Sequence, residues 1–418
     1  MSFFRGFSLN LGSTLAVFAL GFVNTSLLAD ALGREQYGVL KLWTVIVLLG
    51  GLVLAEWLNK GDAYAVGRLG ARDAAVDNTL LFSAAIGALL LLTAPLTLRL
   101  GTLVLPGLTL TQWLLGLGLI ALAVLEKGQL GIFLGEERLR VYALLPLVFI
   151  LVYVAGSLGL VGLDLLSLDR AMTAWLCGLV AAVLVGMVVL RRGGYRPGRG
   201  SRRVLAEMAR IGGRGEVALV LIFLLFKSDV FLVNHFLGQE AVGVYGVATN
   251  FTDMMQRVPN VAAVILFAKV IRGQDSGRLT LQVAGWVLLF SLVCAAGLVL
   301  LGRPLLALFF PRYPDAYVPL VWLLPGMILA GCGSVFNSRL LGQGYPAVTL
   351  WAPALALGVN LGLNLWLIPT LGLRGAALST SIAYSLWGVL VMGYCLRRSR
   401  LGPAEAVCLP WRRPTAPE

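Results

Sequence analysis

The chain has 418 residues, of which 59% are hydrophobic and 13% are charged, and its mean hydropathy is +0.88. Soluble domains are nearer half apolar and a quarter charged, so this composition excludes an ordinary soluble protein and predicts one embedded in a membrane. The net charge of +13 has no basic patch with interleaved aromatic residues, so we assign it to membrane topology and anionic lipid, and not to nucleic acid.

Apolar runs of about 20 residues, each long enough to cross about 30 Å of hydrocarbon, recur along the whole chain. They predict an all-α polytopic membrane protein with about twelve transmembrane helices. Residues 305–310 either extend the helix before them or form a short re-entrant piece. In chain order the expected helices are 9–29, 37–58, 78–98, 109–134, 141–163, 171–190, 216–236, 241–268, 279–301, 317–339, 347–368 and 375–396.

Two short patterns recur about 205 residues apart, and each copy joins two apolar runs. The first is Leu32-Gly33-Arg34-Glu35 with Gly38-Val39, repeated as Leu237-Gly238-Gln239-Glu240 with Gly243-Val244. The second is Leu134-Gly135 with Val141 and Pro146, repeated as Leu341-Gly342 with Val348 and Pro353. Two like halves predict two six-helix lobes related by a pseudo-two-fold axis along the membrane normal, an arrangement that suits a carrier.

One long polar stretch divides the chain. We expect an N-lobe at 1–190, a cytoplasmic basic linker at 191–214, a C-lobe at 215–396 and a cytoplasmic tail at 397–418. The Gly, Pro and Arg content of the linker resists packing. Most of the 33 Lys and Arg residues fall on the side of the membrane that holds both termini, which predicts that both ends are cytoplasmic.

Small residues at helical spacing predict close approach between helices. The stripes are Gly128-x-x-Gly131-x-x-x-Gly135, Gly156-x-x-Gly159-x-x-Gly162 and Gly358-x-x-x-Gly362. Prolines inside apolar runs predict kinks at Pro146, Pro259, Pro325 and Pro353.

The sequence lacks the motifs of the common enzyme classes. It has no phosphate-binding G-x-x-x-x-G-K-[ST] loop, no H-E-x-x-H and no G-x-S-x-G. The five cysteines include no CxxC pair, so we expect no disulfide, no metal and no cofactor. The outer loops between helices are too short for a catalytic domain on that side of the membrane. We therefore expect a protein that is not an enzyme.

Ionisable residues inside the apolar runs are costly and mark functional positions. They are Lys41, Glu56, Glu126, Lys127, Lys227, Asp229, Asp253 and Arg257. Lys41 and Glu56 lie near helix ends and are read as interfacial. Lys227 and Asp229 are two residues apart, so they cannot share a helix face.

The eighth predicted helix carries a polar stripe. Its members are Gly246, Asn250, Asp253, Arg257 and Asn260, whose spacing places them on one face. Asp253 precedes Arg257 by four residues, so the two can pair along the helix. The stripe either lines a cavity or forms a closed structural ion pair between helices.

Two segments resemble a known family. The stretch 360–380, NLGLNLWLIPTLGLRGAALST, resembles the last two helices of polysaccharide flippases of the O-antigen (Wzx) type, and 32–38, LGREQYG, is similar to that family's first outer loop. These flippases belong to the multidrug/oligosaccharidyl-lipid/polysaccharide exporter superfamily. The resemblance implies a V-shaped pair of lobes that opens alternately to each side of the bacterial inner membrane.

The resemblance also implies the cargo, an undecaprenyl-diphosphate-linked oligosaccharide used for surface polysaccharide. Membrane lipids and a polysaccharide polymerase with its chain-length machinery are the implied partners. We expect the diphosphate to meet Arg257, Lys227 and Lys127, with Lys41 a weaker candidate. Asparagines that either bind sugars or pair across helices are Asn250, Asn337, Asn360 and Asn364.

Alternating access requires a group that changes state, and Asp253, Asp229 and Glu126 are the candidates for coupling to H⁺ or Na⁺, a choice that the sequence leaves open. Two other functions remain. One is a cation-coupled multidrug exporter of the same superfamily. The other is a membrane glycan polymerase or ligase.

Overall fold

The computed structural model describes residues 3–104, 107–198, 200–213, 215–271, 273 and 277–398, with the side chains of 3–11 and 103–104 left out. These residues form α-helices and one short 3₁₀ helix, with no β-strand among them. The chain divides into two compact units, Met1–Glu216 and Val217–Glu418. Residues 399–418 of the expected tail lie outside the described residues.

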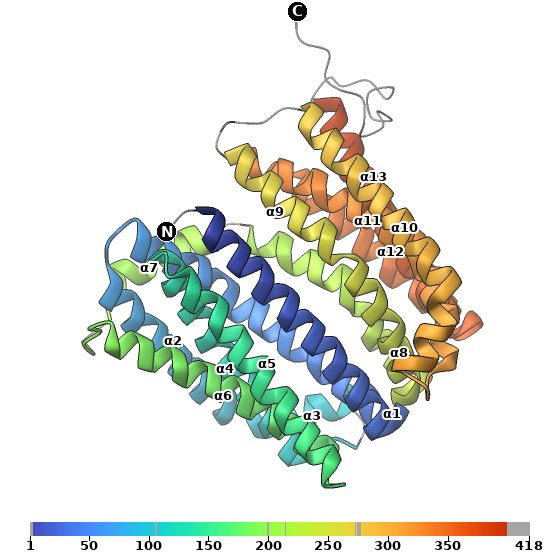
Figure 1. Cartoon of the computed structure of the whole chain (residues 1–418), viewed down its shortest axis with the longest axis horizontal. Helices are drawn as coiled ribbons and strands as arrows, with labels where there is room; N and C mark the ends of the chain where they lie inside the picture. The colour runs from blue at the N-terminus through green and yellow to red at the C-terminus, as the bar shows by residue number, and fades with distance from the viewer. Residues whose placement is uncertain are drawn as a thin grey trace, which may run out of the picture. The chain divides into compact units, whose positions relative to one another are not determined.

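The elements follow one another as helices joined by short turns (Figure 1). The first unit contains α1 Phe3–Gly67, α2 Arg72–Leu92, α3 Ala94–Val104, α4 Leu110–Gly135, α5 Leu139–Gly162, α6 Leu168–Arg192 and α7 Arg202–Gly212. From the start of the second unit run α8 Glu216–Met255, α9 Arg257–Ile271, α10 Gly277–Phe309, the 3₁₀ helix Pro314–Ala316, α11 Tyr317–Gly342, α12 Val348–Leu371 and α13 Leu373–Arg398.

The repeated sequence patterns mark equivalent places in the two units. Gly33 interrupts α1 with φ 77° and ψ 174°, and Gly238 interrupts α8 with φ 84° and ψ 178°. Only glycine adopts this backbone conformation without strain. The second pattern ends α4 at Gly135 and α11 at Gly342. The repeat is therefore structural, since each copy breaks or ends the corresponding helix.

Nine helices in the described part of the chain are long and apolar enough to cross a membrane. Divided at Gly33 and Gly238, α1 and α8 each give two arms, so each unit contains six long helical segments among the described residues, although α8 is not one of these nine helices. The prediction of an all-α membrane protein with two six-helix lobes is confirmed. Residues 305–309 continue α10, so they extend a helix and do not form a re-entrant piece.

The glycine stripes behave differently from one another. A methyl group on Gly131 would collide with the backbone of Asn59, and one on Gly135 would lie 2.8 Å from the carbonyl oxygen of Ala63. The first stripe therefore packs α4 against α1 as predicted. At Gly358 and Gly362 an added Cβ meets nothing within 4 Å. The prediction of close helix approach is wrong at these two glycines. Helical spacing shows that they share a face, but it does not show whether another helix packs on that face.

The four prolines expected to kink helices occupy two kinds of position. Pro146, Pro325 and Pro353 lie inside helices that continue through them. Pro259 lies in the first turn of α9, where its missing N–H costs no helical hydrogen bond. The interruption next to it falls at Gln256, between α8 and α9.

The expectation that 191–214 resists packing is wrong for much of its length. Ser201 caps α7 by accepting a hydrogen bond from the N–H of Val204. Met208 is fully buried with Leu58 and Ala65 of α1 in one apolar cluster. Tyr195 is also buried, and its hydroxyl donates to Asp77 at 2.6 Å. A few apolar positions among the arginines suffice to dock this segment on the first unit.

Candidate functional site in the second unit

A carboxylate lies buried between the two arms of α8 and α13. Asp229 is 1% exposed, and its Oδ2 accepts hydrogen bonds from the hydroxyls of Tyr245 at 2.6 Å and Thr380 at 3.0 Å. Its Oδ1 accepts from the N–H of Val230 at 2.9 Å. Asp229 and Tyr245 stand on opposite sides of Gly238, so these bonds show that the arms of α8 lie side by side. All three donors to Asp229 are neutral.

The hydrogen-bond network continues from Thr380 into α12. The Nδ2 of Asn360 donates to the hydroxyl of Thr380 at 3.3 Å, and the Nδ2 of Asn364 donates to Oδ1 of Asn360 at 2.8 Å. The hydroxyl of Ser379 donates to Oδ1 of Asn364. These four residues are at most 1% exposed. We call Asp229, Tyr245, Asn360, Asn364, Ser379 and Thr380 the Asp229 cluster.

Small residues in α13 bring the cluster together. Gly375 approaches the backbone carbonyl of Leu367 so closely that a methyl group would collide with it. Ala376 and Ala377 beside it are fully buried. The segment 373–380 thus places α13 against α12 and supplies two of the hydroxyls. Asn360 and Asn364 pair across helices, as one of the two readings of the asparagines predicts.

An ion pair links the same two arms of α8. The ammonium of Lys227 lies 2.7 Å and 3.0 Å from the two carboxylate oxygens of Asp253. The side chains are 17% and 33% exposed, so the pair is half-buried. The spacing of residues along one helix did not predict this partner for Asp253. As the sequence predicts, Lys227 and Asp229 point to different partners.

The polar stripe of the eighth predicted helix spans the junction between α8 and α9. The helix stops at Met255, and the amide of Gln256 donates to the carbonyl of Met327 at 2.6 Å. Arg257 is the first residue of α9 and is exposed. Asn250 and Asp253 precede the interruption and are half-buried. Asn250 and Asp253 therefore belong to α8, and Arg257 and Asn260 belong to α9.

The remaining predicted residues belong to the first unit. Lys127 pairs with Glu56 at 3.5 Å, with the Lys127 side chain 41% exposed. Glu56, expected at an interface, is thus the ionic partner of a residue expected to bind cargo. Lys41 and Glu126 are half-buried. Within the described residues, no hydrogen bond or ion pair joins either of them to the Lys127–Glu56 pair.

Sequence reasoning missed a buried carboxylate in the first unit. Asp62 is fully buried, and the hydroxyl of Thr79 donates to it at 2.7 Å. It was missed because the second helix was predicted to end at residue 58. The repeat offset also pairs Asp229 with Asn24, which is 2% exposed. The position equivalent to Asp229 in the first unit is therefore neutral.

The Asp229 cluster has the chemistry of a site for a proton or a small hard cation. It combines one carboxylate with hydroxyl and amide oxygens. Among the described residues, no group of three or more His, Cys, Asp and Glu is placed to hold a metal. A site with a single carboxylate suits a monovalent cation better than a divalent one.

No protein-family model matches the chain, and no curated protein matches it. Solved structures do. A multidrug resistance MATE transporter of the MOP superfamily, inward-facing, aligns over 92% of this chain and 94% of its own with a TM-score of 0.74 and 17% identity. The lipid II flippase MurJ, inward closed, aligns over 95% and 88% with a TM-score of 0.75 and 14% identity.

The chain has the fold of MOP-superfamily transporters. A further member from Pyrococcus furiosus, for which a reversed polarity of the binding pocket is described, aligns over 95% and 94% with a TM-score of 0.67 and 15% identity. At these identities the MOP fold is what the alignments show. The alignments do not show the O-antigen subtype, which is suggested by the sequence segments at 32–38 and 360–380.

Proposed function

We propose that the protein is a flippase that moves an undecaprenyl-diphosphate-linked oligosaccharide from the cytoplasmic to the periplasmic leaflet of the bacterial inner membrane by alternating access. The observation that carries the proposal is the Asp229 cluster, a buried titratable group tied to three helical segments of a MOP fold. The sequence resemblance at 32–38 and 360–380 supports the cargo class. One structure with the same fold is a lipid II flippase.

The first step of the argument concerns the charge on Asp229. An ionised carboxylate inside a bilayer is costly unless a partner offsets its charge. Within the described residues, its hydrogen bonds come from two hydroxyls and one backbone N–H, none of which is charged. Binding a proton or Na⁺ would remove the charge. We propose Asp229 as the coupling residue on this ground.

The second step concerns motion. A cation at Asp229 needs oxygen lone pairs, whereas the bare carboxylate needs O–H donors, so the hydroxyls of Tyr245 and Thr380 must turn between the two states. Tyr245 lies on the second arm of α8 and Thr380 on α13. A change of partner at Asp229 therefore biases how these segments pack, and a ligand that binds one packing better shifts the population towards it.

The third step concerns the anionic cargo. Lys227 forms an ion pair with Asp253, so its charge becomes available to a phosphate only when that ion pair breaks. We propose that the diphosphate competes with Asp253 for the ammonium, and that Arg257, Lys127 and Lys41 contribute further contacts, with Asn250 meeting the sugars. A guanidinium binds phosphate oxygens in pairs, which favours Arg257 among them. Asp253 and Glu126 are the secondary candidates for ion coupling.

The test measures transport in proteoliposomes that contain the purified protein and a fluorescent undecaprenyl-diphosphate oligosaccharide. Flipping is followed by quenching from the outside, with and without an inward Na⁺ or H⁺ gradient. We expect gradient-stimulated flipping in the wild type, and Asp229→Asn to abolish the stimulation while preserving the fold. Ser385→Ala, which removes a hydroxyl that donates to the carbonyl of Ser381 in the same helix, serves as the matched control. Equal stimulation in Asp229→Asn and wild type would exclude Asp229 as the coupling site.

A cation-coupled multidrug exporter is the second candidate, because Lys227 is neutralised and a MATE transporter shares the fold. Deleting the gene separates the two. A flippase predicts lipid-linked glycan trapped in the cytoplasmic leaflet, whereas an exporter predicts drug sensitivity with normal glycan. Accumulation of unpolymerised units in the periplasmic leaflet would instead point to a glycan polymerase or ligase.

The proposal includes orientation and partners. Both termini are placed in the cytoplasm on the distribution of Lys and Arg, and delivery to the outer leaflet would feed a polysaccharide polymerase with its chain-length machinery. Cysteine labelling of the turns from either side of the membrane tests the orientation.

A further inference from the structure

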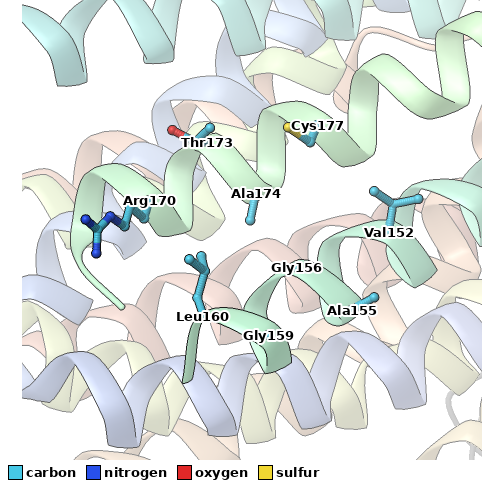
Figure 2. Close-up of a pocket in the computed structure, with 9 residues that line it drawn as sticks. All are labelled: Val152, Ala155, Gly156, Gly159, Leu160, Arg170, Thr173, Ala174 and Cys177. Carbon is cyan, nitrogen blue, oxygen red and sulfur yellow. The ribbon is translucent and has the colours of Figure 1, made fainter. Parts of the chain in front are cut away.

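We propose that a groove between α5 and α6 binds one acyl chain of an anionic phospholipid, with Arg170 contacting the lipid phosphate. The groove lies wholly within the first unit and has a cavity volume of about 590 Å³. Figure 2 shows α5 and α6 running beside one another, with Arg170 near one end and Cys177 and Val152 towards the other. None of the residues proposed for cargo or coupling lines it.

The groove exists because small residues, Gly156, Gly159 and Ala174, form its base. Gly156 meets Ala174 with a notional Cβ contact of 3.2 Å, so the two helices touch there. One turn further on, a Cβ added to Gly159 would meet nothing within 4 Å. Val152 and Leu160 line the groove along α5. The glycine stripe of α5 thus brings α6 close at Gly156 and leaves a channel at Gly159.

The exposed surface around the groove is apolar. Leu151 and Leu158 on α5 are 54% and 52% exposed, and Leu184 on α6 is 58% exposed. Both helices are long and apolar enough to span the membrane. Exposed leucines on a spanning helix contact lipid, so the groove is open to hydrocarbon chains. The hydroxyl of Thr173 at the edge of the groove donates to the carbonyl of Asp169, so it does not require a hydrogen-bond acceptor on the bound lipid.

Arg170 adds selectivity at the membrane surface. It lies at the start of α6, directly after the turn that leaves α5, and its guanidinium donates to the carbonyl of Leu165 at 2.6 Å. It is exposed and has no ion pair among the described residues. The acidic neighbours are Asp164, which is exposed, and Asp169, which accepts from the amide of Gln112 on α4. The remaining guanidinium N–H groups suit a phosphate.

These features favour a membrane phospholipid over the polyprenyl-linked cargo. The groove lies between two helices long and apolar enough to span a membrane, with exposed leucines around it, and it carries one cation for one phosphate. A polyprenyl diphosphate would bring more charge than Arg170 offers. Binding of that lipid is the competing outcome of the test.

The test uses the full-length protein and native mass spectrometry after exchange into phosphatidylglycerol or phosphatidylcholine. Gly159→Leu fills the groove without meeting protein atoms. Gly162→Leu is the matched control, because its Cβ also meets nothing within 4 Å and it does not line the groove. We expect the wild type and Gly162→Leu to retain phosphatidylglycerol about tenfold better than Gly159→Leu, because the leucine side chain would take the place of the acyl chain.

A second variant and a label complete the experiment. Arg170→Gln should lose the preference for phosphatidylglycerol over phosphatidylcholine. Phosphatidylglycerol should also slow maleimide labelling of Cys177, an exposed cysteine that lines the groove. Equal retention of the two lipids by the wild type would overturn the proposal. So would equal retention by the two glycine variants, or stronger protection of Cys177 by undecaprenyl phosphate than by phosphatidylglycerol.

Discussion

The hydrogen bond from Tyr245 to Asp229 gives the sharpest test of the cluster. Tyr245→Phe removes one hydroxyl and leaves the ring, and because Tyr245 is fully buried no water replaces the lost donor. Hydrogen bonds to charged groups contribute about 1.5–3 kcal/mol, whereas bonds between membrane helices average about 0.6 kcal/mol. We expect the substitution to lower the free energy of unfolding by about 1.5 kcal/mol, at the lower end of the charged range.

The double-mutant cycle isolates the charge. In an Asp229→Asn background the acceptor is neutral, so Tyr245→Phe should cost only about 0.6 kcal/mol. The coupling free energy is then about 1 kcal/mol. Equilibrium unfolding in mixed micelles, followed by tryptophan fluorescence, measures all four proteins.

Tyr384→Phe provides the control for this cycle. Tyr384 is also buried, but its hydroxyl donates to the carbonyl of Phe226 at 3.0 Å and not to Asp229. Its effect should add to that of Asp229→Asn. If Tyr245→Phe is also additive with Asp229→Asn, within about 0.3 kcal/mol, the bond carries no charge-dependent energy and the coupling argument fails.

Three further predictions concern packing, backbone and pH. Gly131→Ala should lower the free energy of unfolding by about 1–3 kcal/mol through overpacking, whereas Gly358→Ala, which points into open space, should be neutral or raise it slightly; thermal unfolding compares them. Gly238→Ala should cost about 1–3 kcal/mol because of its positive φ, measured as the loss of folded protein in size-exclusion profiles. Burial, and then the Asp77 carboxylate, raise the pKa of the Tyr195 hydroxyl, so its contribution is full below the unfolded pKa of about 10 and falls as pH rises further. The stability difference between wild type and Tyr195→Phe should therefore stay constant from about pH 7 to 9 and shrink above about pH 10; a difference that grows with pH would contradict this.

Much of the fold was predictable because hydrocarbon thickness fixes helix length. The repeat was legible at Gly33 and Gly238, where the backbone requires glycine. The packing of 202–212 was not predicted, because a short amphipathic helix among arginines has few apolar positions. At Gly358 the stripe was correctly placed on a face, but the sequence does not say that the face lacks a helix partner.

The site was predicted in part. Asp229 stood out as a carboxylate in an apolar run, but its partners come from 16 residues away for Tyr245 and 151 residues away for Thr380, separations that no local spacing encodes. The pairing of Lys227 with Asp253 could not be predicted for the same reason, since it depends on how the two arms of α8 pack against each other. Asp62 was lost to a boundary error of a few residues.

The docking of α7 has a consequence for anyone who divides this gene. Composition invites a cut just before residue 191, yet such a fragment would strip Trp57 and Gly61 of the cover that Gly212 and Met208 give them. A fragment that retains α7 keeps that surface closed. If the two halves are co-expressed as separate chains that associate without a covalent link, the N-terminal chain should therefore include the arginine-rich segment 191–214.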